Sequence, residues 1–249
     1  IALKWGYEKK KIAGDANIIV FGNNFHGRTI TIVSFSSEPG YRQGFGPFTP
    51  GFKEVPFGSV GDLESAVDEN TVGILLEPIQ AEAGILLPPN GFLRAVREIC
   101  NRRNVLMLAD EIQTGLGRTG KNFCYEHEGV LPDLLILGKS LGGGLLPISA
   151  VVGKADVMNV IEPGQHGSTF GGNPLAAAVS RTAMSVLRDE KLSDRAARLG
   201  GQVMDKLRSQ NLPHVREVRG KGMLIGVELD PASGGARKYC ERLAEEGVL

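Results

Sequence analysis

The sequence predicts an α/β protein built on a largely parallel β-sheet. Short apolar segments alternate with longer segments of helical periodicity up to about residue 153. Several of these short segments are apolar throughout, as expected for strands covered on both faces. Glycine, proline or asparagine bounds each of them. Strands that alternate with helices in this way favour parallel pairing.

The expected strands lie in the first part of the chain, at residues 17–21, 72–77, 105–110, 134–138 and 148–153. The clearest helix between them is expected at residues 91–103. Phe92, Val96 and Ile99 recur there on one side at helical spacing, with arginines elsewhere.

The pattern changes after Gly172. Asn173 and Pro174 open a long alanine-rich helix that runs toward Asp189. Another helix, a pair of strands around a Gly-Lys-Gly turn and a last helix are expected at 193–209, 215–229 and 235–246. These last elements are too few to close a core alone. We therefore expect a large domain over residues 1–190 and the beginning of a smaller, incomplete domain over 191–249.

Composition excludes several classes of protein. The 249 residues include 28 Lys and Arg and 28 Asp and Glu, so we expect no nucleic-acid or membrane partner recruited by bulk charge. No apolar run reaches the roughly 18 residues of a membrane span. The three cysteines lack CxxC spacing, which argues against a zinc site and fits a reducing, cytoplasmic location. The chain opens at Ile1 within a helical stretch, so we expect an internal fragment.

Two residues at strand ends are the first candidates for chemistry. Asp110 ends one expected strand, and Lys139 follows another, 29 residues later. Ligands of open α/β sheets bind at the carboxyl ends of strands, so the two side chains should face one crevice. Glycines at 142–144 would let a flat ligand approach, and burial of the lysine would favour its nucleophilic form. A lysine for a Schiff base and an aspartate for a pyridinium nitrogen are what pyridoxal phosphate chemistry requires.

Spacing alone leaves other interpretations open, because a loop lysine and a helix-capping carboxylate would look the same. The GLGRTG segment at 115–120 matches a dinucleotide-binding pattern, but it does not follow its strand directly. The end of a P-loop has the same residues as Gly138-Lys139-Ser140. An NTPase, however, needs a glycine at the position that Asp133 occupies here. No metal site is expected, because ligand spacing is absent among the histidines, His26, His127, His166 and His214.

Five segments of the chain, in order, closely resemble the class III (subgroup II) aminotransferases. They are FHGRT, LLEPIQAEAG, LMLADEIQTGLGRTG, LGKSLGGGLLPISA and HGSTFGGNPLA. The resemblance runs along the whole chain, and the motifs are jointly highly specific. It implies the fold type I of pyridoxal-phosphate-dependent transferases, with a mostly parallel seven-stranded sheet in the large domain and a smaller C-terminal α+β domain. It also implies a homodimer with active sites at the interface.

The resemblance implies pyridoxal 5'-phosphate as cofactor and gives roles to matching residues. Lys139 would hold the cofactor covalently and move the substrate proton, and Asp110 would keep the ring nitrogen protonated. Gln113 would bond the ring hydroxyl oxygen. Phe25 would stack on the ring, with His26 beside it.

Four further positions concern the cofactor's surroundings and the substrate. Glu77 would lie near the cofactor on the substrate side, and Thr169 would reach the cofactor phosphate of the neighbouring subunit. Arg28 would take the α-carboxylate of ornithine. Glu82 would pair with an arginine of the small domain, and release of that arginine would admit 2-oxoglutarate. An ordinary surface ion pair remains an alternative for Arg28 and Glu82.

The implied reaction transfers the δ-amino group of ornithine to 2-oxoglutarate by a ping-pong mechanism, giving glutamate semialdehyde and glutamate. Acetylornithine and 4-aminobutyrate remain alternative donors, and a non-catalytic α/β ligand-binding protein is the alternative from another class. Ala81 stands where the family usually has glycine. The family's phosphate-binding loop would lie before Ile1 and the arginine partner of Glu82 beyond Leu249, so we expect the chain alone to be nearly inactive.

Overall fold

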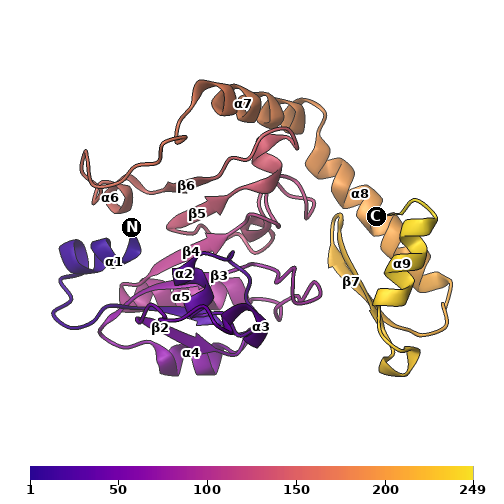
Figure 1. Ribbon diagram of the computed structural model, residues 1–249, viewed down its shortest axis with the longest axis horizontal. Helices are drawn as coiled ribbons and strands as arrows, with labels where there is room; N and C mark the ends of the chain where they lie inside the picture. The colour runs from indigo at the N-terminus through magenta and orange to yellow at the C-terminus, as the bar shows by residue number, and fades with distance from the viewer. Residues whose placement is uncertain (249) are drawn as a thin grey trace.

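The computed structural model describes residues 1–248 and contains a six-stranded sheet with helices packed on it (Figure 1). The strand order is β2-β1-β3-β4-β5-β6. Neighbours pair in parallel except β6, which runs antiparallel to β5. The strands are β1 (Asn17–Phe21), β2 (Phe52–Val55), β3 (Thr71–Leu76), β4 (Leu106–Asp110), β5 (Leu134–Leu137) and β6 (Ala150–Gly153). The predicted α/β class and mostly parallel sheet are confirmed, with six strands in this part of the chain rather than the seven implied.

The helices are mostly short in the first half of the chain and long near its end. The α-helices of residues 1–248 are α1 (Ala2–Trp5), α2 (Ile30–Ser34), α3 (Pro39–Arg42), α4 (Val60–Ala66), α5 (Phe92–Arg103), α6 (Ala155–Met158), α7 (Pro174–Asp189), α8 (Leu192–Ser209) and α9 (Arg237–Glu245). Single turns of other helix types are η1 (Gly6–Lys10), η2 (Cys124–His127), η3 (Lys139–Gly142) and η4 (Pro231–Ser233). None of the described helices is long and apolar enough to cross a membrane.

Strand β2 is the strand of the main sheet that the sequence pattern missed. Its four residues, Phe-Lys-Glu-Val, lie at the edge of the sheet and are only partly buried. An edge strand with charged side chains lacks the continuous apolar run of the central strands. The other strands lie within a few residues of their expected bounds.

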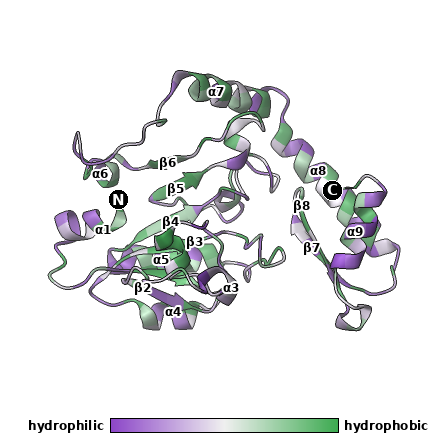
Figure 2. Cartoon of the chain, in the orientation of Figure 1, coloured by the Kyte–Doolittle hydropathy of each residue, from purple (hydrophilic) through white to green (hydrophobic). Residues whose placement is uncertain are grey.

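The central strands β1, β3 and β4 are buried on both faces, which is why they are mostly apolar. Ile19 and Phe21 of β1 face one core cluster, which includes residues of α4 and α5. Ile18 and Val20 face a second cluster on the opposite side, which includes residues of α1. Figure 2 shows these strands as hydrophobic in the interior. Two cores hold the strands rigidly, so the side chains at their carboxyl ends are fixed in space.

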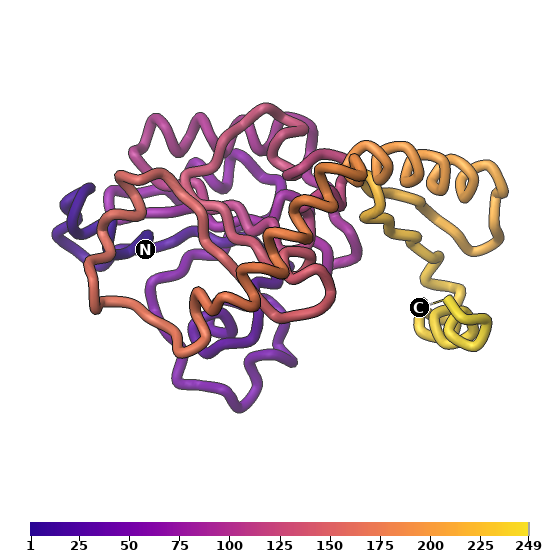
Figure 3. The backbone as a smooth tube through the Cα atoms, turned by 90° about the horizontal axis from the view of Figure 1, so that it is seen from above, coloured from indigo at the N-terminus to yellow at the C-terminus, as the bar shows by residue number. Residues whose placement is uncertain are grey.

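The C-terminal part forms a separate unit beside the sheet. Strands β7 (Val215–Lys221) and β8 (Leu224–Leu229) form an antiparallel hairpin that pairs with no strand of the main sheet. The hairpin packs on α8, and α8, the hairpin and α9 project from one side of the molecule (Figure 3). The domain boundary at residue 190 stays a prediction.

Gly200 lies where α8 meets the hairpin. A Cβ placed there would be 1.8 Å from the carbonyl oxygen of Gly222, whereas one at Gly201 would meet open space. We expect Gly200→Ala to lower the free energy of unfolding of the full-length protein by roughly 2 kcal/mol or more, because two backbones must separate. Gly201→Ala should raise it by up to about 1 kcal/mol through helix propensity. Urea unfolding measures both, and equal midpoints for the two variants would contradict this packing.

Candidate active site

Asp110 is the last residue of β4, and its side chain is only 6% exposed. The Nδ1 atom of His26 lies 2.7 Å from its Oδ2 atom, and the backbone N–H of Ile112 donates to Oδ1 at 3.1 Å. The His26 side chain is also buried, and its Nε2 atom has no hydrogen-bond partner within residues 1–248. With Asp110 ionised, His26 donates from Nδ1 and fixes the carboxylate.

Glu77 follows β3 and is buried beside this pair. Its Oε1 atom accepts a hydrogen bond of 2.8 Å from the backbone N–H of Phe25. Burial disfavours the charged carboxylate and raises the pKa of Glu77 to about 7, although the nearby His26 opposes part of the increase. The hydrogen bond from its backbone N–H to Glu77 holds Phe25 at the edge of the site.

Lys139 begins η3, immediately after β5. Its φ angle is 43°, a left-handed conformation that costs a non-glycine residue about 1–3 kcal/mol and is common at functional sites. Our expectation that this lysine is buried is wrong, because it is exposed. Since β5 ends at Leu137 and the chain turns at once into η3, the residue stands at the edge of the sheet rather than within it.

These side chains share one cavity of about 120 Å³, which lies at the carboxyl ends of the strands. Six residues expected from the sequence line it, namely Phe25, His26, Glu77, Asp110, Gln113 and Lys139. They follow β1, β3, β4 and β5, so four neighbouring strands of the sheet contribute to one site. The cavity therefore combines a buried carboxylate, an amine and an aromatic ring.

Three expected residues do not line this cavity. Glu82 is exposed, but its Oε1 atom accepts a hydrogen bond of 3.1 Å from Nε2 of Gln113. The guanidinium of Arg28 lies 4.2 Å from the ring centre of Tyr41 and 5.8 Å from that of Phe25. Thr169 lies in the exposed segment 162–172, away from the cavity of its own chain.

Glu111 is a residue that the sequence analysis did not select. It is 1% exposed, and its carboxylate accepts hydrogen bonds from Oγ1 of Thr114 and from the backbone N–H groups of Cys124 and Tyr125, at 2.7–2.9 Å. Burial raises its pKa. Glu111 thus ties together the loop that carries Gln113. From the sequence, an acidic residue that follows Asp110 could equally be a helix cap, so the role of Glu111 in ordering this loop could not be predicted.

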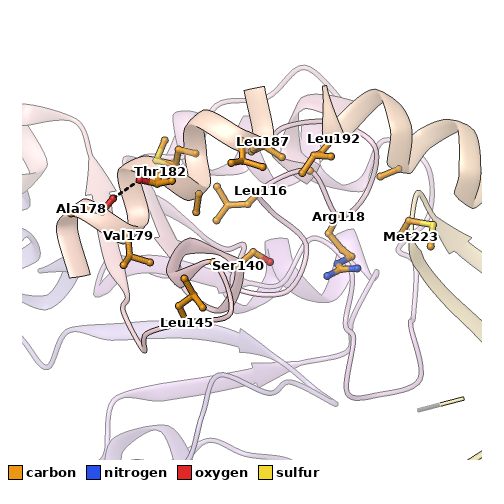
Figure 4. Close-up of a pocket in the computed structure, with 16 residues that line it drawn as sticks. Leu116, Arg118, Ser140, Leu145, Ala178, Val179, Thr182, Leu187, Leu192 and Met223 are labelled. Atoms are coloured by element: carbon orange, nitrogen blue, oxygen red, sulfur yellow. Dashed lines mark hydrogen bonds between the residues drawn. The ribbon is translucent and has the colours of Figure 1, made fainter. Parts of the chain in front are cut away.

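A second cavity of about 660 Å³ lies on the other side of the η3 turn, beneath α7 and the start of α8 (Figure 4). Its lining is mostly aliphatic and includes Leu116, Leu145, Val179 and Leu187. Arg118 is the one charged side chain among the described lining residues. Although this cavity is larger, its described lining residues include no acid–base pair, so the smaller cavity is the candidate active site.

Comparison with known proteins agrees with this geometry. The family described as Aminotransferase class-III matches residues 1–249. The chain belongs to the class III aminotransferases. Among curated members, it is 54% identical over 249 residues to the ornithine aminotransferase of Bacillus subtilis (strain 168), covering 100% of this chain and 61% of that protein. It is 53% identical over 247 residues to the enzyme of Brevibacillus brevis, covering 99% of this chain and 61% of that protein.

Solved structures of aminotransferases are also similar to this chain. The ornithine aminotransferase of Toxoplasma gondii ME49 superposes with a TM-score of 0.97 at 49% identity, covering 100% of this chain and 60% of that one. The acetylornithine aminotransferase of Elizabethkingia anophelis superposes with a TM-score of 0.86 at 48% identity, covering 100% and 62%. This aminotransferase chain therefore spans about three fifths of the length of these relatives.

The cofactor of this family is pyridoxal phosphate, and another structure of the Toxoplasma enzyme is described as having PLP at partial occupancy in its active site. The chemistry of the donor set in this chain fits that group. Asp110 is a buried carboxylate at the cavity, as a protonated ring nitrogen requires. Lys139 places an amine at the same cavity, and Phe25 offers an aromatic ring.

Glu77 should make the stability of this aminotransferase depend on pH. Its pKa is raised from 4.5 to about 7 in the folded protein, so the folded state binds the proton more tightly than the unfolded state. Stability should therefore fall as pH rises through that window, by about 3.5 kcal/mol at 1.4 kcal/mol per pKa unit. Glu77→Gln should lack this fall. Urea unfolding of both cofactor-free, full-length proteins from pH 4 to pH 8 measures it, and a pH-independent difference between them would contradict it.

Proposed function

We propose that the chain is the cofactor-binding part of an ornithine aminotransferase. The full-length protein would transfer the δ-amino group of ornithine to 2-oxoglutarate, giving glutamate semialdehyde and glutamate. The observation that carries this proposal is that the Asp110 carboxylate, the Lys139 amine and the Phe25 ring share one cavity. Glu82 beside Gln113 is the feature that favours a diamino acid.

Pyridoxal phosphate, when bound, supplies a ring that accepts electrons from the reacting carbon of the substrate. Asp110 holds a proton on the ring nitrogen, and the Nδ1–H of His26 keeps the carboxylate in place. Lys139 would hold the cofactor covalently until the amino group of the substrate displaces it, and the freed amine would then take the proton from the substrate carbon. Positioned acid–base catalysis of this kind contributes about 10²–10⁴ in rate.

The substrate side is formed by two charged groups at the rim. The guanidinium of Arg28 stacks on Tyr41, which fixes its plane and leaves its donors for the α-carboxylate of ornithine. The carboxylate of Glu82 would bind an arginine from outside residues 1–249 while ornithine is bound, and would release it for 2-oxoglutarate. Gln113 bonds Glu82 and would also reach the ring hydroxyl oxygen.

The position of Thr169 supports an assembly of two subunits. Because its segment is exposed and away from the cavity of its own chain, we propose that it completes the phosphate site of a neighbouring subunit in a homodimer. The cysteines, Cys100, Cys124 and Cys240, are all free, in keeping with a cytoplasmic enzyme.

The test is covalent trapping of the cofactor. The full-length protein is mixed with pyridoxal phosphate, reduced with borohydride and mapped by peptide mass spectrometry. A single dominant adduct on Lys139 is expected, whereas labelling scattered over many lysines would contradict the proposal.

Acetylornithine is the second candidate donor, because an acetylornithine aminotransferase superposes at 48% identity. Turnover of ornithine, acetylornithine and 4-aminobutyrate by the same preparation separates these functions. Preference for acetylornithine or 4-aminobutyrate would overturn the assignment to ornithine and leave the cofactor site intact.

A further inference from the structure

The loop that carries Glu82 has a strained backbone. Gln80 and Leu86 close it with two backbone hydrogen bonds of 3.0 and 2.9 Å. Within it, Ile85 has a φ angle of 56°. A β-branched residue is a genuine outlier in this region, and such a conformation persists only where its surroundings hold it.

Arg219 of β7 provides that support from the C-terminal unit. Its Nε and Nη2 atoms donate to the carbonyl oxygen of Gly84 at 3.1 and 2.8 Å, and Nε also donates to that of Ile85 at 3.1 Å. Its Nη1 atom donates to the carboxylates of Glu217 and Glu228 on the hairpin itself. The side chain is only 16% exposed, and its planar fork joins the hairpin to the loop.

The tip of the same hairpin contacts the second loop of the site. The backbone N–H of Met223 donates to the carbonyl oxygen of Arg118 at 2.9 Å, in the loop that follows Gln113. Gln113 in turn donates to Glu82 at 3.1 Å. The hairpin therefore touches both loops, and the two loops meet at the Glu82–Gln113 hydrogen bond.

We propose that Arg219 is a positioning residue for substrate selection. By holding the carbonyl groups of Gly84 and Ile85, it keeps the Glu82 carboxylate beside Gln113 at the substrate side of the site. The inference rests on the proposed function and deepens it, because it makes recognition of a diamino acid depend on the C-terminal hairpin. Arg219 contacts the carbonyl groups of Gly84 and Ile85 and touches neither Asp110 nor Lys139, so the contacts of these two residues with the cofactor do not depend on it.

The first test replaces Arg219 by glutamine in the full-length holoenzyme. We expect kcat/KM for ornithine to fall about tenfold or more, while the absorbance spectrum of the bound cofactor stays unchanged. In the cofactor-free protein, amide hydrogens of residues 81–86 should exchange faster. Arg216→Gln is the matched control, because Arg216 lies on the same strand, is exposed and, within residues 1–248, pairs only with Glu228.

A double variant decides whether Arg219 acts through Glu82. If it does, Arg219→Gln combined with Glu82→Gln should lose no more activity with ornithine than Glu82→Gln alone. Additive losses, a changed cofactor spectrum, or unchanged exchange in residues 81–86 would each overturn the proposal. If Arg219→Gln does not fold, Arg219→Lys tests the same contact. Lysine keeps the positive charge but lacks the planar fork that reaches the carbonyl groups of Gly84 and Ile85, so it should give the same selective loss.

Turnover of ornithine by the wild-type protein tests the proposed function separately from this inference. A wild-type enzyme that does not use ornithine would refute the proposed function. The exchange of residues 81–86 and the kinetics of whichever donor is used would still support or refute the role of Arg219.

Discussion

Replacing Lys139 by alanine is expected to lower turnover of the full-length enzyme at least about 10²–10⁴-fold. The change removes the amine at the cavity of Asp110 and Phe25, which is the group that we propose to hold the cofactor and to move the substrate proton. Because Lys139 is exposed, the free energy of unfolding of the cofactor-free protein should change by less than about 0.5 kcal/mol. Steady-state kinetics and urea unfolding of the same preparation measure both effects.

Lys121→Ala is the matched control, because Lys121 is exposed and does not line the cavity. It should leave turnover unchanged. Added methylamine should restore part of the activity of the Lys139→Ala variant, since a small amine can accept the proton in place of the side chain. A Lys139→Ala enzyme that retained wild-type turnover would contradict the role of this lysine.

The part of the site that lies at the strand ends could be predicted from the sequence. Asp110 and Lys139 follow continuous apolar strands, and the rule that ligands bind at strand ends is enough to expect them in one crevice. The structure places both at one cavity because β4 and β5 are adjacent and parallel. Their roles came only from the resemblance to a family, since spacing cannot separate a catalytic lysine from a loop lysine.

Contacts between distant segments were beyond sequence reasoning. His26 and Asp110 are separated by 84 residues, and their 2.7 Å contact depends on the relative register of β1, β3 and β4. Arg219 reaches Gly84 over 135 residues, from a hairpin whose own sequence indicates only paired strands. Hydrophobic periodicity predicts which face of a helix or strand is buried, but it does not predict which residues that face contacts.

Replacing Asp110 by asparagine is expected to lower turnover by about 10²–10³-fold, the cost of removing one preorganised electrostatic group from a water-poor site. Asparagine has nearly the same shape but cannot stabilise a proton on the ring nitrogen. It also turns the charge-assisted bond from His26 into a weaker neutral one. The ornithine half-reaction, followed in a single turnover, measures the change directly.

The His26→Ala variant shows whether the pair acts as a unit. It should lose less activity than Asp110→Asn, because it removes only the group that holds the carboxylate in place. When both changes are combined, the loss should be close to that of Asp110→Asn alone, since His26 acts through the Asp110 carboxylate. Losses that multiply would instead mean that the buried ring of His26, with its unpartnered Nε2 atom, contributes separately to catalysis.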